Sequence, residues 1–276
     1  MPLAVIPIDL NPTIVAIGPL MFTWHGLFTA VGLGAGVWLA ARLGARMGLK
    51  EDDVMAVALW GTVGGVIGAR LWHVIDLWSY YAQHPLAIVQ INEGGLAIYG
   101  VAVGGPLAGA IYARRRGLSV GKLADAAAPA LLLGFAIGRV GDIINGEHHS
   151  LPTSLPWALV YVHPNTLGQP GLAVHPAVAY EQLWDLAVFA VLIWLFARMP
   201  RPGMLFWTAG LLYSVGVFVI RFFREDAAIW AFGLTEAQLS AIVGGVASLW
   251  LVLFLAARAR REQATRPDRG AAAARG

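Results

Sequence analysis

The chain contains seven apolar stretches, and each is close to the roughly 20 residues that a helix needs to cross the hydrocarbon core of a membrane. They cover residues 24–41, 54–77, 96–113, 123–144, 176–197, 204–223 and 238–257. Hydrophobic residues make up 58% of the chain and charged residues only 13%, which is unlike the balance of a soluble protein. The sequence therefore predicts an all-α, polytopic membrane helix bundle with about seven transmembrane helices.

The distribution of Lys and Arg predicts the orientation of this bundle, because short cytoplasmic loops accumulate positive charge. With seven spans, all but four of the 19 Lys and Arg residues fall on one side, in the segments 42–50, 114–122, 198–201 and 258–275. We therefore expect the N-terminus outside and the C-terminus in the cytoplasm. Because the basic residues form short clusters between spans, they indicate membrane topology and no nucleic-acid partner.

The domain organisation follows from the same pattern. Residues 1–261 are predicted to form a single transmembrane domain. Residues 262–276 are rich in Ala, Gly and Arg, and this low-complexity composition predicts a disordered cytoplasmic tail.

Glycines recur at a spacing of four residues inside several predicted spans. Small residues so placed let helix backbones approach closely in lipid, so compact helix packing is the expected role. Close approach to the glycerol backbone of a lipid is the alternative. The pairs are Gly32 with Gly36, Gly61 with Gly65, Gly64 with Gly68, and Gly100 with Gly104.

Four arginines, Arg70, Arg139, Arg221 and Arg224, fall toward the outer ends of the even-numbered spans, against the charge bias that sets topology. A charge at membrane depth costs at least a few kcal/mol, so each should be paired or face a polar cavity. Arg221 and Arg224 could instead extend to the outer headgroups. The chain has no cysteine, so any thiol chemistry must use the thiol of a partner.

The densest polar segment covers residues 138–149. On a helix, Arg139 and Asp142 share a face and could simply form an internal ion pair. Alternatively, Arg139, Asp142 and Asn145 form a polar stripe directed into the bundle, with Glu147 just beyond the helix. A guanidinium can hold a phosphate by two parallel hydrogen bonds, and the phosphates of the outer leaflet are lipid headgroups.

At this segment the chain resembles a known family, the prolipoprotein diacylglyceryl transferases of the bacterial inner membrane. The run from Gly138-Arg139 to Asn145-Gly146-Glu147 is similar to the family signature, in which a Gly-Arg pair is followed by a Gly-Asn and an Asn-Gly-Glu. Further blocks follow in the family's order. They are Gly18-Pro19 leading to Trp24-His25-Gly26, Gly68-Ala69-Arg70, residues 94–100, Asp125 with Pro129, His175-Pro176 with Tyr180-Glu181, and residues 222–225.

The resemblance implies an activity. Such an enzyme moves the diacylglyceryl group of phosphatidylglycerol onto the lipobox cysteine of a preprolipoprotein at the outer face of the inner membrane, and it releases glycerol phosphate. This is the first step of lipoprotein maturation. The implied partners are phosphatidylglycerol, preprolipoprotein signal peptides with a lipobox cysteine, and other membrane lipids. The implied location is the bacterial inner membrane, as a multi-pass protein, and we expect no cofactor.

The resemblance also implies site residues. Arg139 is the first choice for the phosphate, with Arg70 and Arg221 as further cations, while Asn145 and Glu147 orient the glycerol hydroxyls or Arg139 itself. The predicted catalytic set is Arg139, Glu147 and Tyr99. The predicted substrate-binding set is Arg139, Asp142, Asn145, His25, Arg70, Glu181 and Arg221.

Two groups of residues have simpler interpretations. Glu181 and Asp185 are four apart on one helix face and could form a buried polar contact. His148, His149 and His163 have a spacing that is weak support for a metal site, so we predict no metal.

The chain departs from the family pattern in three ways. Tyr99 stands where well-known members have a histidine, Asp142 replaces the first asparagine of the signature, and Val217 with Arg221 replace an arginine four residues before a glutamate. A tyrosine hydroxyl, with a pKa near 10, is a poor base. Glu147, His25 and Asp142 are therefore candidates for the base, and deprotonation assisted by the phosphate would need none of them.

These departures leave a second hypothesis, a non-catalytic phospholipid-binding or lipid-moving membrane protein of the same fold. A small-solute transporter is a third hypothesis, because charges inside a membrane also mark translocation routes. Against the transporter, the charges gather toward one leaflet, and the second half of the chain does not repeat the first.

Overall fold

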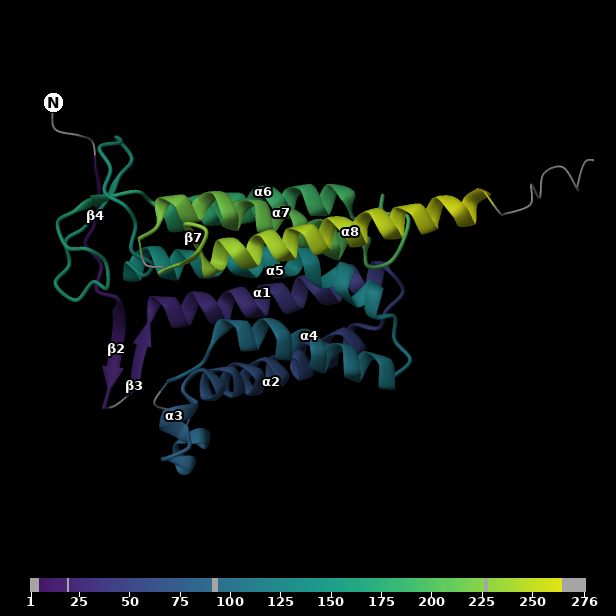
Figure 1. The fold of residues 1–276 in the computed structure, drawn as a ribbon, viewed down its shortest axis with the longest axis horizontal. Helices are drawn as coiled ribbons and strands as arrows, with labels where there is room; N and C mark the ends of the chain where they lie inside the picture. The colour runs from purple at the N-terminus through teal and green to yellow at the C-terminus, as the bar shows by residue number, and fades with distance from the viewer. Residues whose placement is uncertain (1–4, 19, 91–93, 226–227, 265–276) are drawn as a thin grey trace, which may run out of the picture. The chain divides into compact units, whose positions relative to one another are not determined.

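The computed structural model describes residues 5–18, 20–90, 94–225 and 228–264 (Figure 1). Pro19 of the first motif and the predicted tail from residue 265 onward lie outside the described residues. The chain divides into two compact units. The larger unit comprises Met1–Gly36 with Ala127–Gly276, and the smaller unit comprises Val37–Ala126. The single transmembrane domain predicted over residues 1–261 stays a prediction.

Seven long helices coincide with the seven predicted spans. They are α1 (Trp24–Arg46), α2 (Glu51–Asp76), α4 (Ile98–Arg115), α5 (Val120–Asn145), α6 (Ala177–Leu195), α7 (Met204–Ile220) and α8 (Glu236–Ala264). Six of them are long and apolar enough to cross a membrane. The remaining one, α4, has 18 residues, includes Pro106, and ends in two arginines. The chain is therefore a multi-pass membrane protein, whereas the count of seven spans and the orientation stay predictions.

The smaller unit is built on a close pair of helices, α2 and α4. A Cβ atom on Gly68 would lie 2.3 Å from the carbonyl oxygen of Gly100, and one on Gly104 would lie 2.4 Å from that of Gly64. Backbone therefore contacts backbone where the sequence has its glycine pairs, which confirms the packing role predicted for them. Between the two helices the chain forms the short helices α3 (Trp78–Tyr81) and η1 (Pro85–Val89).

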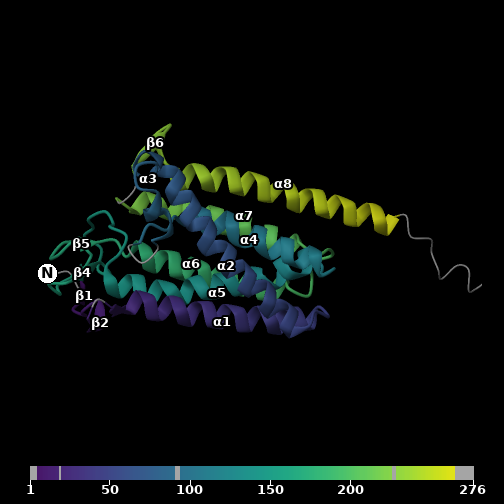
Figure 2. The same ribbon diagram turned by 90° about the horizontal axis from the view of Figure 1, so that it is seen from below.

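In the larger unit, α5 lies between α6 and the N-terminal part of α1 (Figure 2). A Cβ atom on Gly32 of α1 would lie 2.5 Å from the carbonyl oxygen of Gly134 of α5. The core between α5, α6 and α7 is apolar and includes Leu132, Leu192 and Leu205. At α8, the helix continues to Ala264, so the first three residues of the tail predicted as disordered are helical.

The described residues also form short strands, which the sequence pattern does not predict. A three-stranded sheet has the order β1 (Ile6–Ile8), β4 (Leu159–Tyr161) and β5 (Ala173–Val174), with β1 parallel to β4 and β4 antiparallel to β5. Two hairpins pair β2 (Thr13–Ile17) with β3 (Leu20–Thr23) and β6 (Ile229–Ala231) with β7 (Leu234–Thr235). Strands of two to five residues are too short for an alternating pattern to be recognised.

Candidate active site

The site is organised by the way α5 ends. Gly146 has a φ of +77°, and the backbone N–H groups of Gly146 and Glu147 both donate to the carbonyl of Asp142. A Cβ atom on Gly146 would lie 2.6 Å from the backbone nitrogen of Gly168, so the turn has no room for a side chain there. This glycine ends the helix in the left-handed conformation and turns the chain back, which brings Glu147 beside the last turn of α5.

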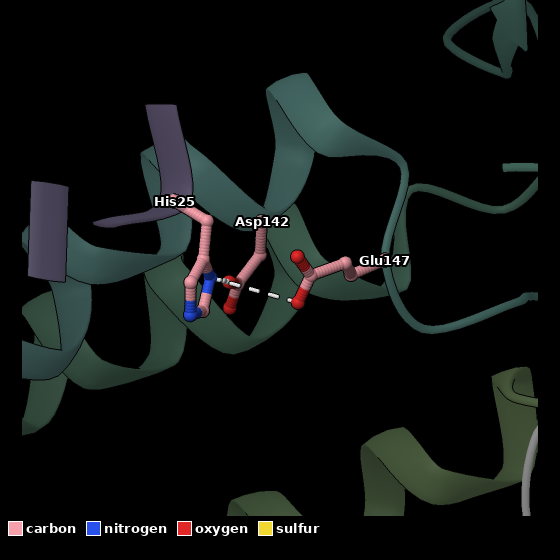
Figure 3. A group of neighbouring side chains, drawn as sticks. All are labelled: His25, Asp142 and Glu147. Carbon is pink, nitrogen blue, oxygen red and sulfur yellow. Dashed lines mark hydrogen bonds and ion pairs between the residues drawn. The ribbon is translucent and has the colours of Figure 1, made fainter. Parts of the chain in front are cut away.

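A second glycine brings α1 to the same place. A Cβ atom on Gly141 would lie 2.6 Å from the Cα of His25, so the start of α1 rests directly on α5. As a result the Nδ1 atom of His25 lies 2.6 Å from Oδ1 of Asp142 and 3.5 Å from Oε2 of Glu147 (Figure 3). The His25 side chain is 44% exposed and that of Asp142 only 8%.

The two oxygens of Asp142 face different partners. While Oδ1 faces His25, Oδ2 accepts a hydrogen bond of 2.9 Å from Nη1 of Arg139. The other terminal nitrogen of Arg139, Nη2, lies 2.7 Å from Oε2 of Glu181. The internal ion pair considered from the sequence is therefore present, and Glu181 extends it. Each terminal nitrogen of a guanidinium has two N–H groups, so these partners leave donors for a further anion.

Glu181 links this pair to a second arginine. Nη1 of Arg224 donates to Oε1 of Glu181 over 3.0 Å, and the Arg224 side chain is 2% exposed. The proposal that Arg224 reaches the headgroups is wrong, because its side chain is buried against a carboxylate. The predicted site residue of this region is Arg221, which begins the helix η3 (Arg221–Phe223), so Arg224 is missing from the prediction although it lies in a block that resembles the family.

The remaining acidic and amide groups are oriented within the same cluster. Nδ2 of Asn145 donates to Oε1 of Glu147 over 2.9 Å, which fixes the Glu147 carboxylate with its other oxygen toward His25. Asp185, one turn along α6 from Glu181, is buried as predicted for that helix face. Its Oδ2 atom has no hydrogen-bond partner among the described residues.

Among the described residues, one group of three potential metal ligands is close together, and it consists of His25, Asp142 and Glu147, whose ligand atoms lie within 4.8 Å of one another. The hydrogen bond between His25 and Asp142 already satisfies two of them. Of the loop histidines, His148 is near this group, with its Nε2 atom 4.0 Å from Oδ2 of Asp142, and the other two have contacts elsewhere. Nε2 of His149 lies 2.9 Å from the carbonyl of Leu167, and Nδ1 of His163 accepts the N–H of Asn165.

Tyr161 of β4 supports the end of α5 from the sheet side. Its hydroxyl donates to the carbonyl of Ile143 over 3.0 Å. Burial, together with the nearby negative charge of Asp142, raises the pKa of Tyr161 to about 12. The hydroxyl therefore stays protonated and acts as a hydrogen-bond donor.

The other two predicted site residues, Arg70 and Tyr99, belong to the smaller unit. Arg70 is buried, and its guanidinium donates to five backbone carbonyls at distances of 2.5 to 3.1 Å. These acceptors belong to Ala87, Ile88, Gln90, Gly94 and Gly95. Arg70 was predicted as a further cation of the substrate-binding set. In the structure its donors instead hold the backbone of residues 87–90 and 94–95 ahead of α4. Tyr99 lies in the first turn of α4 with its ring against Trp72.

Comparisons with known proteins agree with the resemblance read from the motifs. A model of the prolipoprotein diacylglyceryl transferase family matches residues 12–254. The chain is 39% identical over 265 residues to a phosphatidylglycerol–prolipoprotein diacylglyceryl transferase of Trichormus variabilis, which covers 91% of this chain and 93% of that protein. A protein of the same name from Geobacillus kaustophilus is 38% identical over 247 residues, covering 86% of this chain and 90% of the relative. One from Bacillus cereus is 38% identical over 233 residues, covering 82% and 84%.

Proposed function

Because this chain belongs to the prolipoprotein diacylglyceryl transferase family, we propose that it transfers the diacylglyceryl group of phosphatidylglycerol to preprolipoproteins. The acceptor is the lipobox cysteine thiol, and the reaction takes place at the outer face of the bacterial inner membrane. Glycerol phosphate is the second product. Nucleic acid has no part in this function, since the basic residues serve topology.

The chemistry is a displacement at carbon. The thiol sulfur attacks the glyceryl carbon that bears the phosphate ester, the carbon–oxygen bond breaks, and its electron pair leaves with the phosphate. Such a reaction needs cationic donors on the departing phosphate and a group that receives the thiol proton.

The observation that best supports this proposal is the position of Arg139. Its side chain is 20% exposed, and its guanidinium is held between Asp142 and Glu181 and keeps donors for a phosphate oxygen. We assign the phosphate to Arg139, the glycerol hydroxyls to Asn145 and Glu147, and the orientation of Arg139 to Glu181. Arg221 stays in the proposed substrate-binding set and Tyr99 in the proposed catalytic set, and Arg70 becomes a positioning residue.

A transfer assay tests the proposal. Purified protein in detergent is incubated with phosphatidylglycerol and a peptide that carries a lipobox cysteine, and mass spectrometry detects the thioether and glycerol phosphate. We expect both products in equal amounts. Bound phosphatidylglycerol without any thioether would instead favour the non-catalytic lipid-binding protein suggested by the departures at Tyr99, Asp142 and Val217.

The proposed orientation has its own test. A reporter fused after Arg258 should give a cytoplasmic signal, and one inserted near Thr166 should give an external signal, because the basic loops and tail are retained inside. Enzymatic reporters that are active on one side only make the measurement. Interchanged signals would move the proposed site to the cytoplasmic face and contradict the location of the reaction.

A further inference from the structure

We propose that His25 is the general base that accepts the thiol proton, and that Asp142 positions it. This inference rests on the proposed transferase function and adds a catalytic residue to it. In the sequence, His25 was one of three candidates for this role, and its part in the predicted site was substrate binding. The contacts of the described residues select it.

The hydrogen bond to Asp142 determines which nitrogen of His25 can act. Nδ1 lies 2.6 Å from Oδ1 of a carboxylate, which can only accept, so Nδ1 carries the proton in this contact. Nε2 then has a free lone pair. It lies at the edge of the ring that faces away from both carboxylates (Figure 3). The neutral imidazole is thus held in the tautomer that a general base requires.

The side chains of His25 and Asp142 differ in their exposure. With 44% of its side chain exposed, His25 can be reached by a thiol that enters from outside, whereas Asp142 at 8% cannot. When Nε2 takes a proton, the buried carboxylate stabilises the imidazolium that forms. An amide at position 142 would keep the shape of the contact and lose this charge.

The other candidates are already engaged. Asp142 has its oxygens facing His25 and Arg139. The imidazole of His148 lies farther from this carboxylate than that of His25, with Nε2 at 4.0 Å from Oδ2, and it is Nε2 that faces Asp142. Glu147 has one oxygen on Asn145 and the other toward His25. Tyr161, whose pKa is raised to about 12, donates its hydroxyl to a carbonyl. Arg139 is the cation of the cluster and cannot accept a proton.

In the proposed step, the cysteine S–H bond breaks and its proton moves to Nε2 of His25. The sulfur forms a bond to the glyceryl carbon as the bond from that carbon to the phosphate oxygen breaks, and glycerol phosphate leaves with the electron pair. The imidazolium then returns its proton to water or to the released phosphate. His25 and Asp142 regain their starting state.

Steady-state kinetics of His25→Ala and His25→Gln test this assignment. At about pH 7 we expect kcat to fall by about 100-fold or more in both variants, while KM for the lipobox peptide changes little. Because a free cysteine thiol ionises near pH 8.5, the defect should shrink to roughly tenfold or less above about pH 9. Added imidazole should restore part of the activity of His25→Ala. His163→Ala removes an imidazole whose Nδ1 atom accepts the backbone N–H of Asn165, and this variant should behave as the wild type.

The role of Asp142 has a separate readout, because Asp142 also pairs with Arg139. If Asp142 acts through His25, Asp142→Asn lowers kcat in the wild-type background but adds little to His25→Ala. Full additivity would assign its effect to Arg139 and overturn the positioning role.

Three outcomes would contradict the assignment of His25 as the general base. The first is a wild-type kcat in His25→Ala, the second is a kcat defect of the same size at every pH, and the third is a change of KM in the His25 variants without a change of kcat. A wild-type protein that forms no thioether refutes the transferase function and this inference together, whereas an active wild type with an equally active His25→Ala refutes only the base.

Discussion

Two arginines, one in each unit of the molecule, show how differently the same side chain can be used. Arg70 in the smaller unit is surrounded by five backbone carbonyls, which occupy its donors. Arg139 in the larger unit is held by two carboxylates, which balance its charge and leave donors over. A guanidinium whose donors are all used stabilises a loop, and one with donors remaining can bind a ligand.

The largest expected effect concerns Arg139, the arginine with donors remaining. We expect Arg139→Ala to lower the rate of thioether formation by about 1,000-fold or more, since it removes the cation assigned to the departing phosphate. Arg139→Lys should restore little of that rate, because an ammonium cannot bridge Asp142, Glu181 and a phosphate with a planar array of donors. The assay is product formation at saturating lipid.

Protein folding is the control for Arg139→Ala, because two carboxylates lose their partner. Comparable elution from size exclusion in detergent and an unchanged helical signal would show that the loss is chemical. An active Arg139→Ala protein would remove Arg139 from the site and leave it as the internal ion pair that the i,i+3 spacing also permits.

The next effect concerns Arg70. Because Arg70→Ala leaves five backbone carbonyls without the donors that hold them, we expect it to lower the free energy of unfolding by about 2–3 kcal/mol. Arg70→Lys should recover only part of this, since one ammonium cannot reach acceptors spread from Ala87 to Gly95. Thermal unfolding in detergent makes the measurement. Full stability combined with lost lipid binding would return Arg70 to the substrate-binding role suggested by its sequence motif.

The contrast between the two arginines also shows what the sequence can predict. Seven helices could be predicted because each apolar run is long enough to cross a membrane. Whether a run of that length spans the hydrocarbon core depends on its own composition and on no distant partner. The cluster at residues 138–149 was located because the polar residues there are close in sequence. The glycine pairs predicted close packing because a helix face without side chains lets any neighbouring helix approach closely, whichever helix that is.

Partnerships across elements could not be predicted in the same way. His25 and Asp142 are 117 residues apart, and Glu181 and Arg224 are 43 apart, so no spacing rule connects them. The five acceptors of Arg70 are backbone carbonyls, which every residue carries, so no residue type marks them. Arg221 was preferred to Arg224 for a similar reason, because exposure depends on the packing of α6 against the end of α7.

The smallest expected effect tests whether the larger unit needs the close approach of α1 and α5. In Gly141→Ala the new methyl group would lie 2.6 Å from the Cα of His25, so the start of α1 must move by several tenths of an ångström. We expect about 1–3 kcal/mol of destabilisation and a roughly tenfold lower kcat, since overpacking shifts the backbone that carries His25. Gly138→Ala, one turn earlier on the same helix and with open space around its Cβ position, is the matched control for stability. If Gly141→Ala unfolds at the same temperature as Gly138→Ala, then α1 is not held against α5 at this glycine. The contact between His25 and Asp142 would then owe its geometry to some other restraint.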